Sequence, residues 1–173
     1  MKNIWNKINY GIGILNLLTG IIVFYSIFKI AKRQYNSMIK FSEQNGLETF
    51  NESMWKLFFQ NQTTIILLFL TISGILLLLR NKYGWIFGLS SWVVIALIFI
   101  PTAIYGISDV TITTMGHDHW IKIFSGIGLL VSIIFITTLL LKPIRIINKV
   151  NSISWLLSFG IILVLYYAVP IIL

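Results

Sequence analysis

Five long apolar runs, each free of charged and histidine side chains through its middle, occupy most of this sequence. A helix needs roughly 20 mainly apolar residues to cross about 30 Å of membrane hydrocarbon. These runs predict an all-α fold, a polytopic transmembrane helical bundle of five spans that forms a single integral membrane domain over residues 1–173. The expected spans are approximately residues 10–30, 63–79, 85–107, 123–141 and 153–173.

The composition also indicates a membrane protein. Hydrophobic residues make up 57% of the chain and charged residues 10%, whereas about a quarter of the residues in soluble domains are charged. The absence of cysteine excludes disulfides and thiolate metal sites. The net charge is +8, but most of the basic residues lie near the ends of apolar runs. That placement favours contact with the lipid bilayer and argues against nucleic acid as a partner.

The distribution of Lys and Arg predicts the orientation. Five spans place seven basic residues and no acid on one side, and six basic residues with all five acids on the other. The charge rule weighs short loops most, and the loops around Lys82 and Arg145 are the short ones. We therefore expect a cytoplasmic N-terminus and a C-terminus outside. The preference for Lys over Arg, with abundant Ile and Asn, is typical of AT-rich bacterial genomes, which suggests a bacterial inner (cytoplasmic) membrane.

The connection between the first two spans, residues 31–62, is the longest. Its second half places apolar residues on one helical face, and Asn45-Gly46 is a turn signal before them. Two arrangements fit: an extramembrane helical hairpin closed at Asn45-Gly46, or an amphipathic segment over residues 47–59 that lies on the lipid surface. The hairpin is favoured because neither proline nor glycine separates Ile30 from Asn45.

Small residues recur at helical spacing in the third and fourth spans. Such spacing lets helix backbones approach closely in lipid, either within one chain or between chains. The predicted helix-packing residues are Gly84, Gly88, Ser125, Gly128 and Ser132.

The polar residues expected inside the membrane are uncharged. They are candidates for interhelical hydrogen bonds or for the lining of a pore, and Asn16 is the costliest of them to bury. This set comprises Asn16, Ser90, Ser91, Thr137 and Thr138.

Two further sets lie outside the hydrocarbon. Lys142, Arg145 and Lys149 fall on one face of a short interfacial helix, where we expect lipid headgroups to bind. His117 and His119 are candidate metal ligands, because imidazole binds zinc and copper. They supply only two ligands, however, and a structural zinc site wants four. A polar loop with two solvated histidines is the favoured explanation, and the metal motif is weak.

No catalytic constellation is recognisable and no cofactor is implied. No charged or histidine side chain lies within a span to relay protons, and no hydrolase, zinc-helix or phosphate-loop motif is present. We expect a non-catalytic integral subunit or accessory protein that packs against other membrane proteins. Two alternatives stay open: a homo-oligomeric pore or membrane effector built from copies of the chain, and a carrier of an apolar small molecule or lipid. The aromatic residues for such a carrier would be Trp92, Tyr105, Tyr166 and Tyr167.

Overall fold

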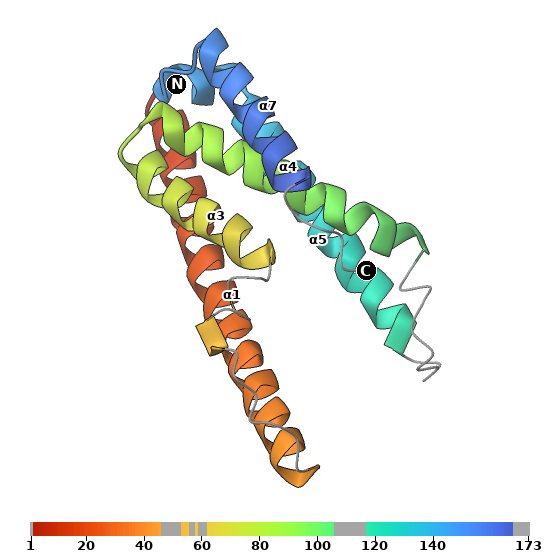
Figure 1. The fold of residues 1–173 in the computed structure, drawn as a ribbon. Coiled ribbons are helices and arrows are strands. Elements are labelled where there is room, and N and C mark those ends of the chain that lie inside the picture. The colour runs from red at the N-terminus through yellow and green to blue at the C-terminus, as the bar shows by residue number, and fades with distance from the viewer. Residues whose placement is uncertain (1, 46–52, 56–57, 59–61, 106–116, 168–173) are drawn as a thin grey trace.

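The computed structural model describes residues 2–45, 53–55, 58, 62–105 and 117–167, and this part of the chain is almost wholly helical, with no strand (Figure 1). The all-α prediction is therefore confirmed. The helices are α1 (Lys2–Gln44), α3 (Gln62–Leu78), α4 (Lys82–Tyr105), α5 (His117–Leu140), α6 (Lys142–Ile147) and α7 (Ser152–Tyr167).

Helix length does not confirm five spans. Three helices are long and apolar enough to cross a membrane, within Asn3–Gln44, Lys82–Ile104 and Lys122–Leu140. The second and fifth predicted spans correspond to the shorter apolar helices Thr63–Leu78 and Ser152–Tyr167. At 1.5 Å per residue these reach about 24–26 Å, which is less than the hydrocarbon thickness. The predicted fifth span also includes residues 168–173, which lie outside the described residues.

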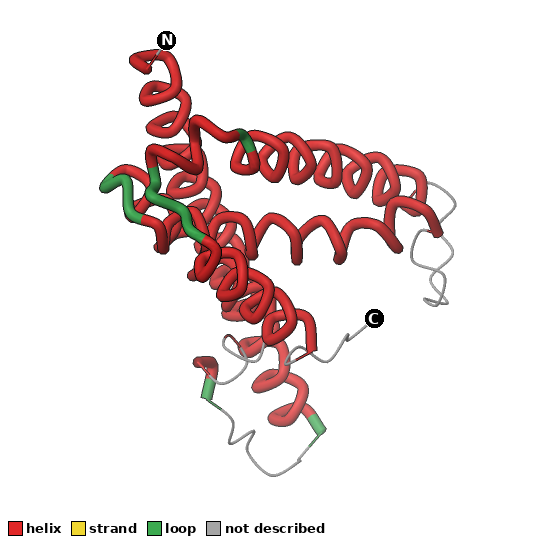
Figure 2. The backbone as a smooth tube through the Cα atoms, turned by 90° about the horizontal axis from the view of Figure 1, so that it is seen from above, coloured by secondary structure: helices red, strands yellow, loops and turns green. Residues whose placement is uncertain are grey.

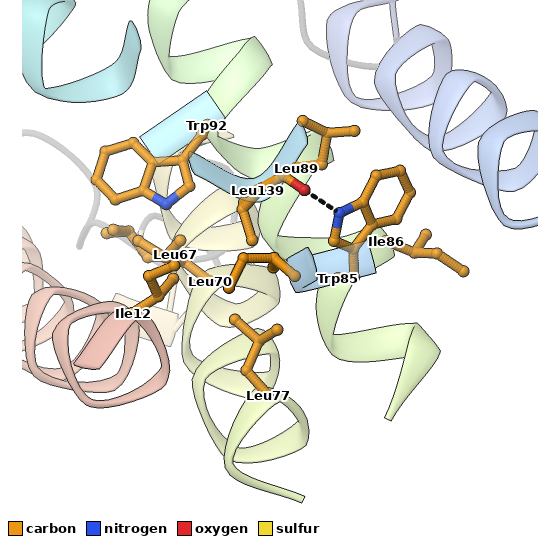
Figure 3. Packing of buried hydrophobic residues seen from close by; sticks show 10 residues of the cluster. Ile12, Leu67, Leu70, Leu77, Trp85, Ile86, Leu89, Trp92 and Leu139 are labelled. Carbon is orange, nitrogen blue, oxygen red and sulfur yellow. Dashed lines mark hydrogen bonds between the residues drawn. The ribbon is translucent and has the colours of Figure 1, made fainter. Parts of the chain in front are cut away.

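Helix α4 is the centre of the arrangement. It packs against α3, α5 and α7, while α1 packs along α3, and α6 contacts the ends of α1 and α5. Figures 1 and 2 show α1 and the α4–α5 pair diverging from the end of the molecule where α6 lies. The buried apolar core therefore sits where α1, α3, α4 and α5 meet, near that end. Its central members are Ile12, Leu67, Leu70, Leu77, Trp85, Ile86, Leu89, Trp92, Leu139 and Ile144 (Figure 3).

Two tight turns connect consecutive helices. After α3 the backbone N–H of Asn81 donates to the carbonyl of Leu76, and Arg80 adopts a left-handed φ of 53°. After α6 the N–H of Val150 donates to the carbonyl of Arg145, with Lys149 at φ 55°. Both are Schellman-type helix ends, which satisfy the last carbonyls and turn the chain sharply. The first turn places α4 alongside α3, and the second leads from α6 into α7, which packs on α4.

Helix α1 continues well past the first predicted span. Its 43 residues extend about 65 Å, roughly twice the thickness of the hydrocarbon. Further along the chain, the fully buried Phe58 contacts Phe24 and Phe28 of α1, with ring centroids 4.9 and 5.7 Å apart. The chain therefore returns alongside α1 before α3 begins. Most of the predicted second arm of the hairpin, including residues 46–52, lies outside the described residues, so the hairpin stays a prediction.

Candidate functional site

A chain of buried hydrogen bonds, here called the polar chain, crosses three helices in the core. The indole Nε1 of Trp92 in α4 donates to Oδ1 of Asn16 in α1 over 3.0 Å. Asn16 Nδ2 donates to Oγ of Ser73 in α3 over 3.1 Å, and Ser73 Oγ donates to the carbonyl of Gly84 in α4 over 2.8 Å. Asn16 and Ser73 are fully buried. The amide that is most costly to place in hydrocarbon thus has hydrogen-bond partners on both of its polar atoms.

The absence of a side chain at Gly88 makes room for the polar chain. A Cβ at this position would lie 2.5 Å from Ser73 Oγ and 3.3 Å from Asn16 Nδ2. The ring of Trp92 also stacks on Phe135 of α5, with centroids 4.3 Å apart and planes 12° from parallel. One tryptophan therefore connects α4 to α1 by a hydrogen bond and to α5 by ring stacking.

A second buried amide pair lies at the α6 end of the molecule. Asn148 Nδ2 donates to Asn9 Oδ1 over 2.7 Å and to the carbonyl of Ile144 over 3.0 Å. Asn9 Nδ2 donates to the carbonyl of Leu77 over 2.9 Å. The Oδ1 of Asn148 and the Nε of Arg145 are buried without a hydrogen-bond partner. This pair connects α1, α3 and the end of α6.

Helices α5 and α7 are attached to α4 through further polar contacts. Trp85 is fully buried, and its Nε1 donates to the carbonyl of Leu139 over 2.7 Å (Figure 3). Its ring meets Trp155 of α7 edge-on, with centroids 4.9 Å apart. The Ser90 hydroxyl donates to the carbonyl of Ser158 over 3.1 Å and lies 3.0 Å from the hydroxyl of that residue. The buried polar groups in the described core therefore connect one helix to another.

The structure does not bring the five predicted pore or interhelical residues onto one surface. Asn16 and Ser90 are buried between helices, and so is Ser91, whose Oγ lies 3.4 Å from the carbonyl of Ile66 in α3. Thr137 and Thr138 lie on α5 and donate to carbonyls of their own helix. Three of the five are therefore placed at helix contacts, and two are placed apart from them.

Gly84, Gly88 and Gly128 lie at contacts between helices. A Cβ at Gly84 would lie 2.5 Å from the backbone N of Leu77, and one at Gly128 would lie 2.5 Å from the ring of Phe99. The two predicted serines are also buried, Ser132 with a hydrogen bond to its own helix and Ser125 at 6% exposure.

A further close approach, between α1 and α3, involves glycines that the sequence patterns did not single out as a pair. A Cβ at Gly74 of α3 would lie 2.6 Å from the backbone N of Leu17 and 2.8 Å from the carbonyl O of Gly13 in α1. Gly13 and Gly74 stand 61 positions apart, and no spacing rule links residues on different helices. Asn9, Asn148 and Ser158 were missed for the same reason.

The three basic residues predicted to bind lipid headgroups differ in environment. Lys142 and Lys149 are exposed, whereas Arg145 is half-buried and lies over the ring of Trp155, 5.6 Å from its centroid. Arg145 therefore serves the packing of α7 as well as carrying charge at the molecular surface.

The histidine prediction falls at the edge of the described region. His117 and His119 belong to the first turn of α5, and their side chains lie outside the described residues. Within the part of the chain that the structure describes, no three His, Cys, Asp or Glu side chains gather where they could hold a metal ion. Metal binding at this turn stays a prediction.

The aromatic residues considered for a carrier do not line one cavity. Trp92 is buried in the core, while Tyr166 and Tyr167 are exposed at the end of α7 and contact each other edge-on. The side chain of Tyr105 lies outside the described residues. An apolar groove of about 360 Å³ runs between α3 and α7, and Trp92, Tyr166 and Tyr167 are not part of its lining. It is lined by Ile65, Phe69, Leu156, Leu157, Gly160, Ile161, Val164 and Leu165.

Comparison of the chain with protein-family models, with curated proteins and with solved structures finds no match.

Proposed function

We propose that this chain is a non-catalytic, multi-pass membrane subunit that packs against partner membrane proteins. The proposal rests on the hydrogen bonds that the buried polar groups of the chain make. Asn9, Asn16, Ser73 and Ser90 direct their hydrogen bonds to other helices of the same chain. Polar groups employed in this way stabilise a scaffold. The surfaces left for function are then the exposed helix faces.

Those exposed faces are apolar and extensive. Helix α5 presents Leu130 and Ile134, each more than 60% exposed, and α7 presents Leu156 and Val164 to a similar degree. In a bilayer such faces contact either lipid tails or the helices of another protein. The hydrophobic effect favours neither contact over the other, because lipid tails are as apolar as the side chains. A subunit of this design offers several sides to partners.

The proposal includes five spans in a bacterial inner membrane, with the N-terminus in the cytoplasm. The depth of α3 supports this span count, because Gly74 packs on Gly13 and Thr71 packs on Gly20 in the apolar half of α1. The pairing of Ser90 with Ser158 likewise places α7 at the depth of α4. Short helices at membrane depth are accommodated by local thinning of the bilayer or by tilt.

The test is purification of the tagged chain from its native membrane in mild detergent, followed by mass spectrometry and native mass measurement. We expect stoichiometric co-purification of at least one other membrane protein. An unrelated multi-pass protein carrying the same tag at matched abundance serves as the control. A homogeneous assembly of this chain alone would contradict the proposal and direct attention to a pore of identical copies.

A further inference from the structure

The part of α1 beyond the first predicted span, residues 31–44, is here called the α1 extension. With 3.6 residues per turn, its side chains fall on three faces. The first face is the least exposed: Ala31 and Ser42 are buried, and Tyr35 and Ile39 are half-buried between them. The other two faces are exposed, and they differ sharply in chemistry.

The second face is basic. It begins at Lys29, just before the α1 extension. Glu43 near its far end is exposed and is the acid on this face, and six further members are all exposed. They line a shallow hollow of about 450 Å³ on one side of the helix. The members of this basic stripe are Lys29, Lys32, Arg33, Asn36, Ser37 and Lys40.

The third face is apolar and lies beside the basic stripe. Ile30, Met38 and Phe41 recur at helical spacing and are 57%, 43% and 62% exposed. Exposed methionine and phenylalanine next to arginine form a combination that is enriched at protein–protein interfaces. Met38 and Phe41 stand beyond the predicted span and so have no lipid tails to cover them.

The exposed faces of the α1 extension could bind a membrane surface or a protein. The continuity of α1 favours a protein. Basic amphipathic helices often lie flat on lipid, but the α1 extension is the direct continuation of a membrane-crossing helix. The headgroup layer is about 5–8 Å thick. The first turn from Lys29 to Arg33 rises about 6 Å and fits within it, whereas Lys40 and Phe41 stand about 16–18 Å beyond Lys29.

Charge complementarity identifies the chemistry of the partner. Lysine and arginine along one face favour carboxylates at matching helical intervals, and the apolar face favours aliphatic or aromatic side chains beside them. A second copy of this chain in the same membrane would set one basic stripe against another, which like-charge repulsion opposes. We propose that the α1 extension binds an acidic amphipathic segment of a partner membrane protein, an inference that rests on the proposed function.

The experiment is site-specific photo-cross-linking of the full-length chain in its native membrane. Phe41 is replaced by p-benzoyl-phenylalanine, and the cross-linked peptide is sequenced by mass spectrometry. The adduct yield is compared between the charge-neutral variant K32Q/R33Q/K40Q and the charge-conserving variant K32R/R33K/K40R. Because all three positions are exposed, both variants are expected to fold, which circular dichroism checks.

We expect an adduct with one membrane protein, through a peptide that carries acidic residues at helical spacing. Its yield should fall about tenfold in the neutral variant, as the loss of three exposed ion pairs predicts, and persist in the charge-conserving variant. Adducts with lipid alone, with a second copy or within the chain would overturn the inference, and so would a yield unchanged in the neutral variant.

Co-purification of the same variants distinguishes a failure of the docking surface from a failure of the proposed function. If partner proteins co-purify but Phe41 forms no adduct with them, the docking surface is wrong and the proposed function stands. If neither cross-linking nor co-purification yields a partner, both fail.

Discussion

Asn16 in α1 accepts a hydrogen bond from the indole of Trp92, 76 positions later in α4, over 3.0 Å. The same asparagine donates to Ser73 of α3, so that one side chain joins three helices. Trp92 lies within a predicted span, away from the membrane interfaces where tryptophan is usually enriched. Its position is explained by the acceptor that Asn16 provides and by stacking on Phe135.

Replacement of Asn16 by leucine should destabilise the fold by about 1–2 kcal/mol, because Trp92 Nε1 would become a buried donor without an acceptor. The free energy of unfolding in mixed micelles, followed by circular dichroism during detergent titration, measures this effect. Thr137→Leu is the matched control, since Thr137 donates only to carbonyls of its own helix and is exposed. Equal losses in the two variants would show that the polar chain contributes nothing specific.

Gly74→Ala should separate α1 from α3. The new Cβ would lie 2.6 Å from the backbone N of Leu17, and backbone atoms cannot move aside as the end of a side chain can. We expect a loss of about 1–3 kcal/mol in unfolding free energy, in the range for overpacked cores. Gly126→Ala is the control, because a Cβ there meets nothing within 4 Å. That substitution should be neutral or stabilise α5 by up to about 1 kcal/mol through helix propensity.

The Asn9–Asn148 pair should show strong coupling in a double-mutant cycle. Asn148→Leu leaves Asn9 Oδ1 without a donor, and Asn9→Leu leaves Asn148 Nδ2 with only the carbonyl of Ile144. Each single substitution should cost about 1–3 kcal/mol, whereas the double substitution should cost less than the sum because no orphaned amide remains. The unfolding free energies of the four proteins give the coupling, and additive values would contradict a direct pair.

The helices themselves were predictable from local sequence. The second predicted span, residues 63–79, corresponds to Gln62–Leu78, and the continuation of α1 past Ile30 follows from the lack of proline and glycine up to Asn45. Whether short helices such as α3 cross the bilayer depends on their depth and tilt relative to neighbouring helices. Composition alone does not contain that information, so the span count was less predictable than the helices.

The candidate site was predictable only in part. Asn16 stood out as an amide within an apolar run, and Gly84 and Gly88 stood out by their spacing. The partners that give these residues a role, Trp92 for Asn16 and Ser73 for Gly88, lie on other helices. Such pairings depend on the rotation and register of packed helices. Asn148 was missed because a basic interfacial helix gave no reason to expect a buried amide there.

Whether α3 crosses the membrane and how the chain is oriented can be decided together by labelling two positions. The natural chain has no cysteine, so Gln44→Cys and Lys142→Cys each introduce one thiol at an exposed residue. With five spans, α3, α4 and α5 separate these positions and place them on opposite sides of the membrane. With three spans, only α4 and α5 separate them, and they share a side. We expect a membrane-impermeant maleimide to label Gln44→Cys in intact cells and Lys142→Cys only after permeabilisation, with the cysteine-free parent as control. Labelling of both or of neither in intact cells would show that α3 does not cross the membrane, and the reverse pattern would invert the orientation.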